Sequence, residues 1–119
     1  KMKKIYYLKS CNTCLRILKS LALSDKFEFL DIKENPLISS DLEHLKTLAG
    51  SYEALFSRRA KLYGEMGLKN ESLTERDYKH YILKHYTFLK RPILVIEQQI
   101  FIGNSPKTIA AAKLALAHE

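Results

Sequence analysis

Residues 5–14 read IYYLKSCNTC, and they carry the clearest structural signal in the chain. The apolar, β-prone run at 5–8 favours a strand, and the polar pair that follows it favours a loop. From Thr13 onward, apolar side chains recur at helical spacing as far as Ala22. The two cysteines of this stretch therefore straddle the predicted N-terminus of a helix.

A second strand is predicted directly after this helix. Residues 27–32 alternate between apolar and polar side chains, as half-buried strands do, and Asn35-Pro36 marks a turn. Strand, helix and strand in this order favour two parallel strands, with the first connecting loop at the end of the sheet where ligands are usually held. We also expect the phenylalanines of the strands to belong to the core, namely Phe27, Phe29 and Phe101.

The middle of the chain is predicted to be helical. Ser40-x-x-Glu43 resembles a capping box ahead of a helix that ends at Gly50. Shorter helical pieces are predicted at 52–56 and 61–66, and Thr74 is expected to cap a longer helix. We interpret residues 36–86 as a helical insertion.

The strand pattern returns after the insertion. Residues 92–96 and 100–102 are predicted strands joined by a turn at 98–99, and Ser105-Pro106 starts a closing helix. The order βαβ, helices, ββα predicts an α/β protein with a thioredoxin-like fold, in which a mixed sheet is flanked by helices. We expect residues 1–119 to form one such domain.

Composition narrows the class of protein. The chain has 119 residues, of which 46% are hydrophobic and 28% charged, as in one soluble domain. No apolar run approaches the roughly 18 residues that cross a bilayer, so we expect no membrane association and a cytoplasmic protein. The net charge of +7 is spread along the chain without a basic tail, so we expect no direct nucleic-acid binding.

The cysteine pair suggests thiol chemistry. A thiol reacts as its thiolate, and a cysteine just before a helix meets unpaired N–H groups and the positive end of the helix dipole, which lower its pKa. Cys11 has this position, whereas Cys14 lies one turn later and could resolve a mixed disulfide formed at Cys11. The alternative is that Cys14 is simply a small core residue. Two cysteines lack the further ligands of a structural zinc site, so no metal is expected.

An oxyanion could bind beside this thiolate. The helix N-terminus, including Asn12 and Thr13, offers backbone donors to an anion. Arginine grips oxyanions through two donors, and the candidates are Arg16, Arg58, Arg59 and Arg91. Arg91 precedes Pro92, and a proline at the mouth of a strand can adopt a cis bond that fixes a turn beside a site.

Several segments taken together resemble the ArsC family, which comprises glutaredoxin-linked arsenate reductases and the related Spx-type transcription regulators. These segments are Cys11 to Cys14 after the first strand, RRAKLYGEMGL at 58–68, LKRPILV at 89–95, and Ile102-Gly103. The resemblance covers nearly the whole chain. It implies a thioredoxin-like fold with a helical insertion and a cis-proline at Pro92.

The resemblance to the reductases also implies roles for residues. Cys11 would be the nucleophile that attacks arsenate, Arg91 the arginine before the cis-proline, and Arg59 or its neighbour Arg58 the earlier arginine. Glutathione with glutaredoxin, or a thioredoxin, would serve as reductant, with no bound cofactor. A third arginine expected after the last hairpin is missing, and only Lys107 stands there.

The resemblance to the regulators rests on the Cys-x-x-Cys pair. In those proteins the pair acts as a disulfide switch, and the protein binds the C-terminal domain of the RNA polymerase α-subunit. Our leading hypothesis is an arsenate-reductase-like thiol oxidoreductase in which Cys11 attacks an oxyanion or a disulfide and Cys14 resolves. The alternative is a redox-switched regulator, and a third possibility is a domain without remaining activity.

Overall fold

Strand β1 (Lys3–Tyr7) opens the computed structural model, which describes residues 2–119. The elements that follow are α1 (Asn12–Leu21), β2 (Glu28–Asp31), α2 (Ser39–Ala49), η1 (Glu53–Leu55), α3 (Lys61–Glu65), η2 (Leu68–Asn70), α4 (Glu75–Lys84), η3 (Tyr86–Phe88), β3 (Ile93–Ile96), β4 (Gln99–Ile102) and α5 (Pro106–Ala117). Those labelled η are single turns of 3-10 helix.

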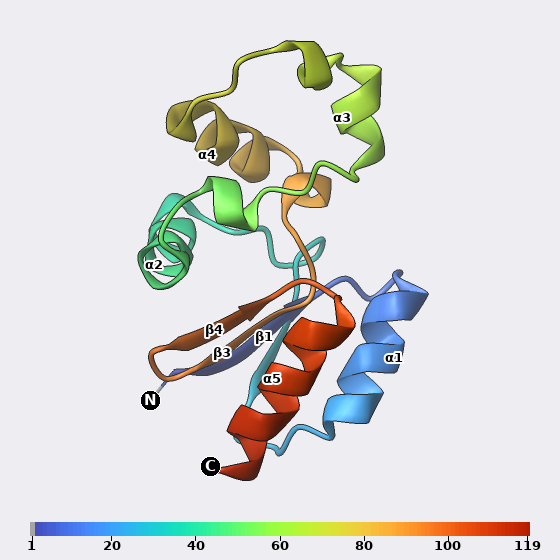
Figure 1. Ribbon diagram of the computed structural model, residues 1–119, viewed down its shortest axis with the longest axis vertical. Coiled ribbons are helices and arrows are strands. Elements are labelled where there is room, and N and C mark those ends of the chain that lie inside the picture. The colour runs from blue at the N-terminus through green and yellow to red at the C-terminus, as the bar shows by residue number, and fades with distance from the viewer. Residues whose placement is uncertain (1) are drawn as a thin grey trace. The chain divides into compact units, whose positions relative to one another are not determined.

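The chain divides into two units, each with its own apolar interior. The first unit comprises residues up to Asn35 together with Arg91–Glu119, and it contains the sheet, α1 and α5 (Figure 1). The second unit, Pro36–Lys90, contains the remaining helices.

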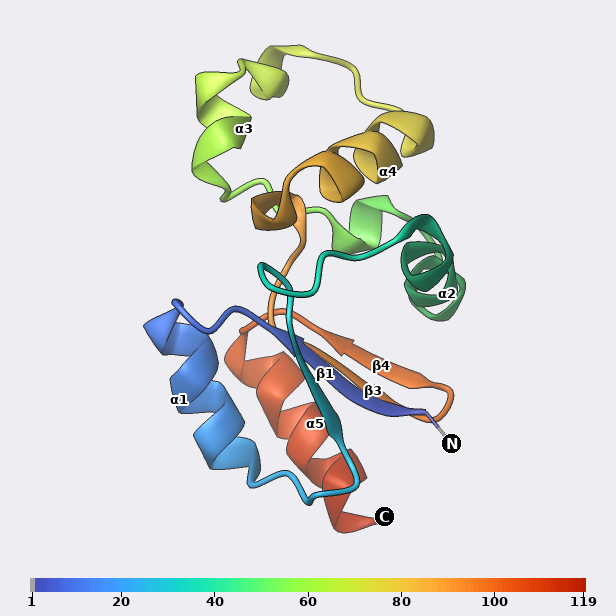
Figure 2. The same cartoon turned by 180° about the vertical axis from the view of Figure 1, so that it is seen from behind.

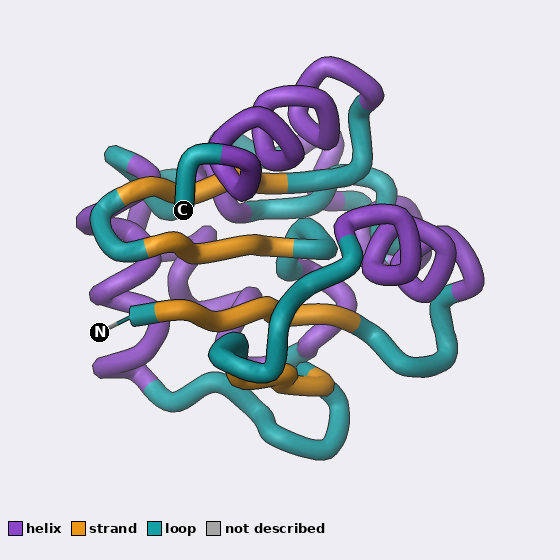
Figure 3. Tube along the Cα trace, turned by 90° about the horizontal axis from the view of Figure 1, so that it is seen from below, coloured by secondary structure: helices purple, strands orange, loops and turns teal. Residues whose placement is uncertain are grey.

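The sheet of the first unit is mixed, with strand order β2-β1-β3-β4. Strand β1 runs parallel to β2 and antiparallel to β3, and β3 and β4 form an antiparallel hairpin (Figure 3). Tyr7 at the end of β1 lies opposite Asp31 at the end of β2, so the predicted parallel pair is confirmed. The loops that leave both strands therefore start at the same edge of the sheet.

Helices α1 and α5 lie side by side over one face of this sheet (Figures 1 and 2). The core between them is apolar and draws on strands and helices alike; its buried members are Ile5, Ile17, Leu21, Phe27, Leu94, Ile96 and Ala112. Fully burying a side chain of this size stabilises a protein by roughly 1.5–3 kcal/mol, so this packing holds α1 firmly against the sheet.

The core of the second unit is built around Phe56, which is fully buried. Its ring stacks on Phe88 with centroids 5.2 Å apart and contacts Tyr78 at 4.9 Å and Tyr63 at 6.0 Å. The Ser57 N–H donates to the Phe88 carbonyl at 2.7 Å. These contacts tie the middle of the second unit to its end.

Helix starts agree with the sequence in two places and differ in one. The Thr74 side chain accepts a hydrogen bond from the Asp77 N–H, and the Ser105 side chain caps α5 ahead of Pro106, as predicted. The predicted capping box at Ser40 is wrong. The N-cap of helix α2 is Ile38, two residues earlier, and it has no side-chain cap; Ser40 already lies inside the first helical turn.

Two further local predictions are corrected. The expected helix at 52–56 is only the 3-10 turn η1. Phe29 is not a core residue, because β2 is an edge strand and 46% of Phe29 is exposed, with its ring packed edge-on against Tyr7. Within residues 2–119 we find no helix with the length and apolar character that crossing a bilayer requires.

Candidate active site

The loop between β1 and α1 places Cys11 at the N-cap position of α1. The Cys11 N–H donates to the Leu8 carbonyl at 3.0 Å, which closes a tight turn after the strand. The Cys11 backbone is extended, and its carbonyl accepts the first helical hydrogen bond, from the Leu15 N–H at 3.1 Å. The Cys11 side chain is half-buried, and its sulfur accepts from the N–H groups of Thr13 and Cys14 in the first helical turn.

A buried carboxylate supports this loop from β2. Asp31 is 7% exposed, and among residues 2–119 no other charged side chain is buried. One of its oxygens accepts a hydrogen bond from the Lys9 N–H at 3.0 Å. The neighbouring Ile32 N–H donates to the Tyr7 carbonyl at 2.9 Å. The end of β2 thus anchors the loop two residues before Cys11, a role that sequence analysis missed.

The pKa of the Cys11 thiol is lowered from its ordinary value. Burial by itself would raise this pKa, but hydrogen-bond donors and one nearby positive charge outweigh it. They are the backbone N–H and the thiol of Cys14, the guanidinium charge of Arg91, and the backbone N–H of Thr13. Cys11 is therefore more anionic at neutral pH than an isolated cysteine.

The pKa of the Cys14 thiol is shifted in the opposite direction. Burial is the main cause that raises the pKa of Cys14 to about 11. The negative charge of Cys11 and the hydrogen bond to Cys11 also raise this pKa, whereas the Leu8 N–H and the charge of Arg91 lower it. The Cys14 thiol is buried and donates its hydrogen bond to the sulfur of Cys11. Both cysteines are free thiols. One thiol is therefore prepared for attack, while the other keeps its proton.

Arg91 and Pro92 lie directly before β3. The Arg91–Pro92 peptide bond is cis, as the resemblance implied, and Pro92 is buried. The Pro92 carbonyl accepts a hydrogen bond from the Gly103 N–H at 2.9 Å, which links the entry of β3 to the end of the hairpin. The charge of Arg91 acts on both cysteines. The structure thus brings the charge of Arg91 to the cysteine pair, with Pro92 next to it in the chain.

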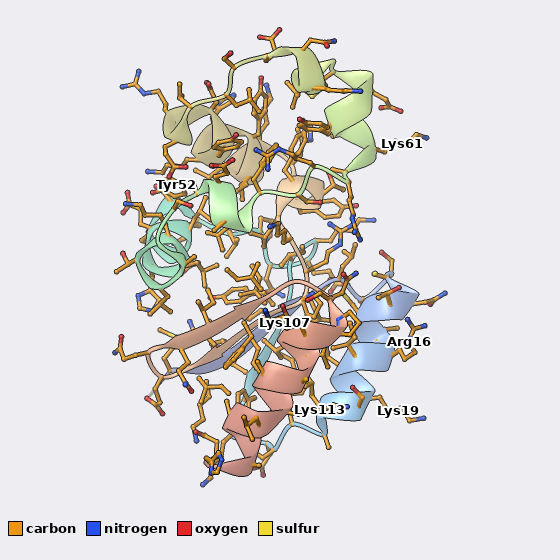
Figure 4. The ribbon with its side chains drawn as sticks, in the orientation of Figure 1. Arg16, Lys19, Tyr52, Lys61, Lys107 and Lys113 are labelled. Carbon is orange, nitrogen blue, oxygen red and sulfur yellow. The ribbon has the colours of Figure 1, made fainter. Side chains whose placement is uncertain are left out.

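The other predicted anion-binding residues of the first unit lie at helix starts. Asn12 is exposed at the first position of α1, and Thr13 is half-buried behind it. Lys107, which stands where a third arginine was expected, is exposed in the first turn of α5 (Figure 4).

The predicted arginines of the insertion belong to the second unit. The guanidinium of Arg58 donates to Glu53 at 2.8 Å and to the Tyr78 hydroxyl at 2.9 Å, and it lies over the Tyr78 ring. The hydrogen bond to Glu53 is the main cause that raises the pKa of Arg58. Arg59 is exposed, and its backbone N–H donates to Ser57 Oγ. Arg58 is therefore engaged inside its own unit, whereas the Arg59 side chain points to solvent.

A mixed sheet with a parallel βαβ start, an antiparallel hairpin and a closing helix defines a thioredoxin-like fold, with a Cys-x-x-Cys pair at the start of α1. The family follows from the sequence match. The model of the ArsC family matches residues 6–112, and the chain belongs to this family.

Two curated relatives carry the name of a transcription regulator. The global transcriptional regulator Spx of Streptococcus pneumoniae is 26% identical over 113 residues, covering 92% of this chain and 84% of the relative. Spx 1 of Lactococcus lactis is 27% identical over 114 residues, covering 92% and 88%.

Among solved structures, the arsenate reductase from Vibrio cholerae superposes with a TM-score of 0.72 at 19% identity, covering 94% of this chain and 99% of that one. At this identity the likeness shows the fold alone.

Proposed function

We propose that this protein is an arsenate-reductase-like thiol oxidoreductase in which Cys11 attacks an oxyanion or a disulfide. The observation that carries the proposal is the opposite direction of the two thiol pKa values in one hydrogen-bonded pair, lowered at Cys11 and raised to about 11 at Cys14. Such a difference separates a nucleophile from a resolving thiol. We expect the protein to act in the cytoplasm, where thiols are kept reduced.

With a disulfide as substrate, the reaction has two steps. The Cys11 thiolate attacks one substrate sulfur, a new S–S bond forms, and the other substrate sulfur leaves as a thiolate. Cys14 then loses its proton to solvent and attacks Cys11, which releases the second substrate thiol and leaves a Cys11–Cys14 disulfide. The substrate gains two electrons, and a dithiol reductant of the glutaredoxin or thioredoxin class returns them to the protein.

With arsenate as substrate, the Cys11 sulfur displaces a hydroxyl group as water and binds arsenic. Glutathione or Cys14 then attacks the Cys11 sulfur, so that arsenite leaves with the electron pair. Both reactants are negative, so cations are needed; we assign Arg91 to this role, with Arg59 or Arg58 as second arginine. The N–H groups at Asn12 and Thr13 would donate to the oxyanion.

The test is arsenate reduction with glutathione and glutaredoxin, run beside reduction of a small neutral disulfide. Cys11→Ser should lose both activities, since it lacks the nucleophile. Cys14→Ser should retain the first attack and accumulate a mixed disulfide at Cys11, visible by mass spectrometry. Activity of Cys11→Ser equal to that of the unmodified chain would overturn the proposal.

A second candidate function is a redox-switched transcription regulator. It is favoured by the Spx relatives, which align over 92% of this chain, and by the Cys-x-x-Cys pair. In this case the C-terminal domain of the RNA polymerase α-subunit would bind, and formation of the disulfide would change its affinity. Binding of that purified domain, measured with reduced and with oxidised protein, tests this candidate; absence of binding in both states would remove it.

A further inference from the structure

The two helices that cover one face of the sheet carry charge of only one sign. Among the residues of α1 and α5 the charged ones are Arg16, Lys19, Lys107 and Lys113, and no aspartate or glutamate is present. All four are exposed, and Figure 4 shows them on these two helices. None of them takes part in a salt bridge between residues 2 and 119.

Helices of the second unit differ in this respect. Lys79 of α4 pairs with Glu43 of α2 at 3.0 Å, and Lys61 of α3 lies 3.8 Å from Glu65. Mixed charges of this kind are usual on solvated helices. The uniform sign on α1 and α5 is therefore a local property of these helices.

The same surface also exposes apolar side chains. Leu15 of α1 is 41% exposed and Leu114 of α5 is 63% exposed. We call this surface the α1–α5 face; it consists of Leu15, Arg16, Lys19, Lys107, Ala110, Lys113 and Leu114. Apolar side chains with charged groups around them are typical of a surface that binds a protein.

The α1–α5 face adjoins the proposed nucleophile, because α1 begins directly after Cys11. We infer that the α1–α5 face docks an acidic segment of a partner protein, either one whose disulfide is attacked by the Cys11 thiolate or one whose thiols reduce the Cys11–Cys14 disulfide that results. This inference rests on the proposed oxidoreductase function and adds the kind of partner. Four exposed cations on helices that contain no acidic residue attract such a segment, raise its rate of encounter, and orient it beside the thiolate.

Nucleic acid fits this surface less well than an acidic protein. Helices α1 and α5 contain no aromatic residue on which a base could stack. A phosphate backbone also offers no apolar group against which the exposed Leu15 and Leu114 could pack.

The experiment uses peptides with one cysteine linked to glutathione by a disulfide, flanked by glutamates or, in a matched peptide, by glutamines. The rate of glutathione release by the reduced chain measures attack by Cys11. We expect the glutamate peptide to react about ten times faster at low ionic strength, and the preference to shrink as salt is added. The decisive quantity is the ratio of the two rates.

The variant R16Q/K19Q/K113Q removes three cations from the face and should abolish the preference. Lys107 is retained because it stands where the resemblance implied a third arginine. The control K61Q/K69Q/K84Q lowers the net charge equally with exposed residues of the second unit and should keep the preference. A preference that survives in R16Q/K19Q/K113Q, or disappears equally in the control, overturns the inference.

A second measurement separates this inference from the proposed function. If no peptide disulfide reacts with Cys11, the proposed chemistry has failed, and the face is then tested by fluorescence anisotropy with the glutamate peptide in which serine replaces cysteine. Binding that R16Q/K19Q/K113Q loses would support the docking surface, and absence of binding would overturn it. A labelled DNA duplex that binds more tightly than the peptide and competes with it would also overturn it.

Discussion

The carboxylate of Asp31 lies buried at the end of β2, where it accepts a hydrogen bond from the Lys9 N–H at 3.0 Å. In Asp31→Ala this N–H loses its acceptor, which costs about 1–3 kcal/mol of stability, whereas Asp31→Asn keeps an oxygen and should cost less. Denaturant unfolding measures both, with Asp25→Ala as an exposed acidic control. An unchanged midpoint for Asp31→Ala would contradict the anchoring role.

The charge of Arg91 lowers the pKa of Cys11, so its removal should raise that pKa. At a fixed pH below the pKa, a higher pKa means a smaller thiolate fraction and slower alkylation. We expect the pH profile of iodoacetamide alkylation to move to higher pH in Arg91→Gln, and less in Arg91→Lys, which keeps the charge. Cys14→Ser serves as the common parent, so that one thiol is titrated. Identical pH profiles for the Cys14→Ser parent and for its Arg91→Gln and Arg91→Lys variants would refute this electrostatic role.

At the scale of the element, α2 and α4 begin in different ways. Thr74 caps α4 through its side chain, while α2 starts without a side-chain cap. Thr74→Ala should therefore destabilise the protein by about 1 kcal/mol, and Ser40→Ala, inside the first turn of α2, should change stability very little. Thermal unfolding of the two variants checks this difference. An equal loss in both would mean that Ser40 acts as a cap after all.

At the scale of the whole molecule, the two units have separate apolar cores, represented by Leu94 in the first and Phe56 in the second. Truncating either residue to alanine should cost about 2–5 kcal/mol. Because local opening follows cooperative units, we expect amide exchange to accelerate mainly in Pro36–Lys90 for Phe56→Ala and mainly outside it for Leu94→Ala. Equal acceleration over the whole chain in both variants would show that the units open together.

Much of the architecture follows from local patterns in the sequence. Apolar spacing predicts α1 and α5, and the polar residues Thr74 and Ser105 mark the starts of α4 and α5. The order of these elements predicts the mixed sheet, and the position of Cys11 before a helix predicts its reactivity. Periodicity and capping depend on neighbours within a turn or two, so the linear sequence contains them.

Tertiary structure alone decided which distant residues meet. No sequence pattern indicates that the Asp31 carboxylate holds the Lys9 N–H or that Phe29 lies exposed on an edge strand. The resemblance pointed to Arg91, but only the fold shows that its charge acts on Cys11. The pKa of about 11 at Cys14 is likewise a consequence of burial under the packed sheet. Burial, electrostatic fields and contacts between remote segments arise from packing, whereas helix and strand formation can be predicted from local sequence.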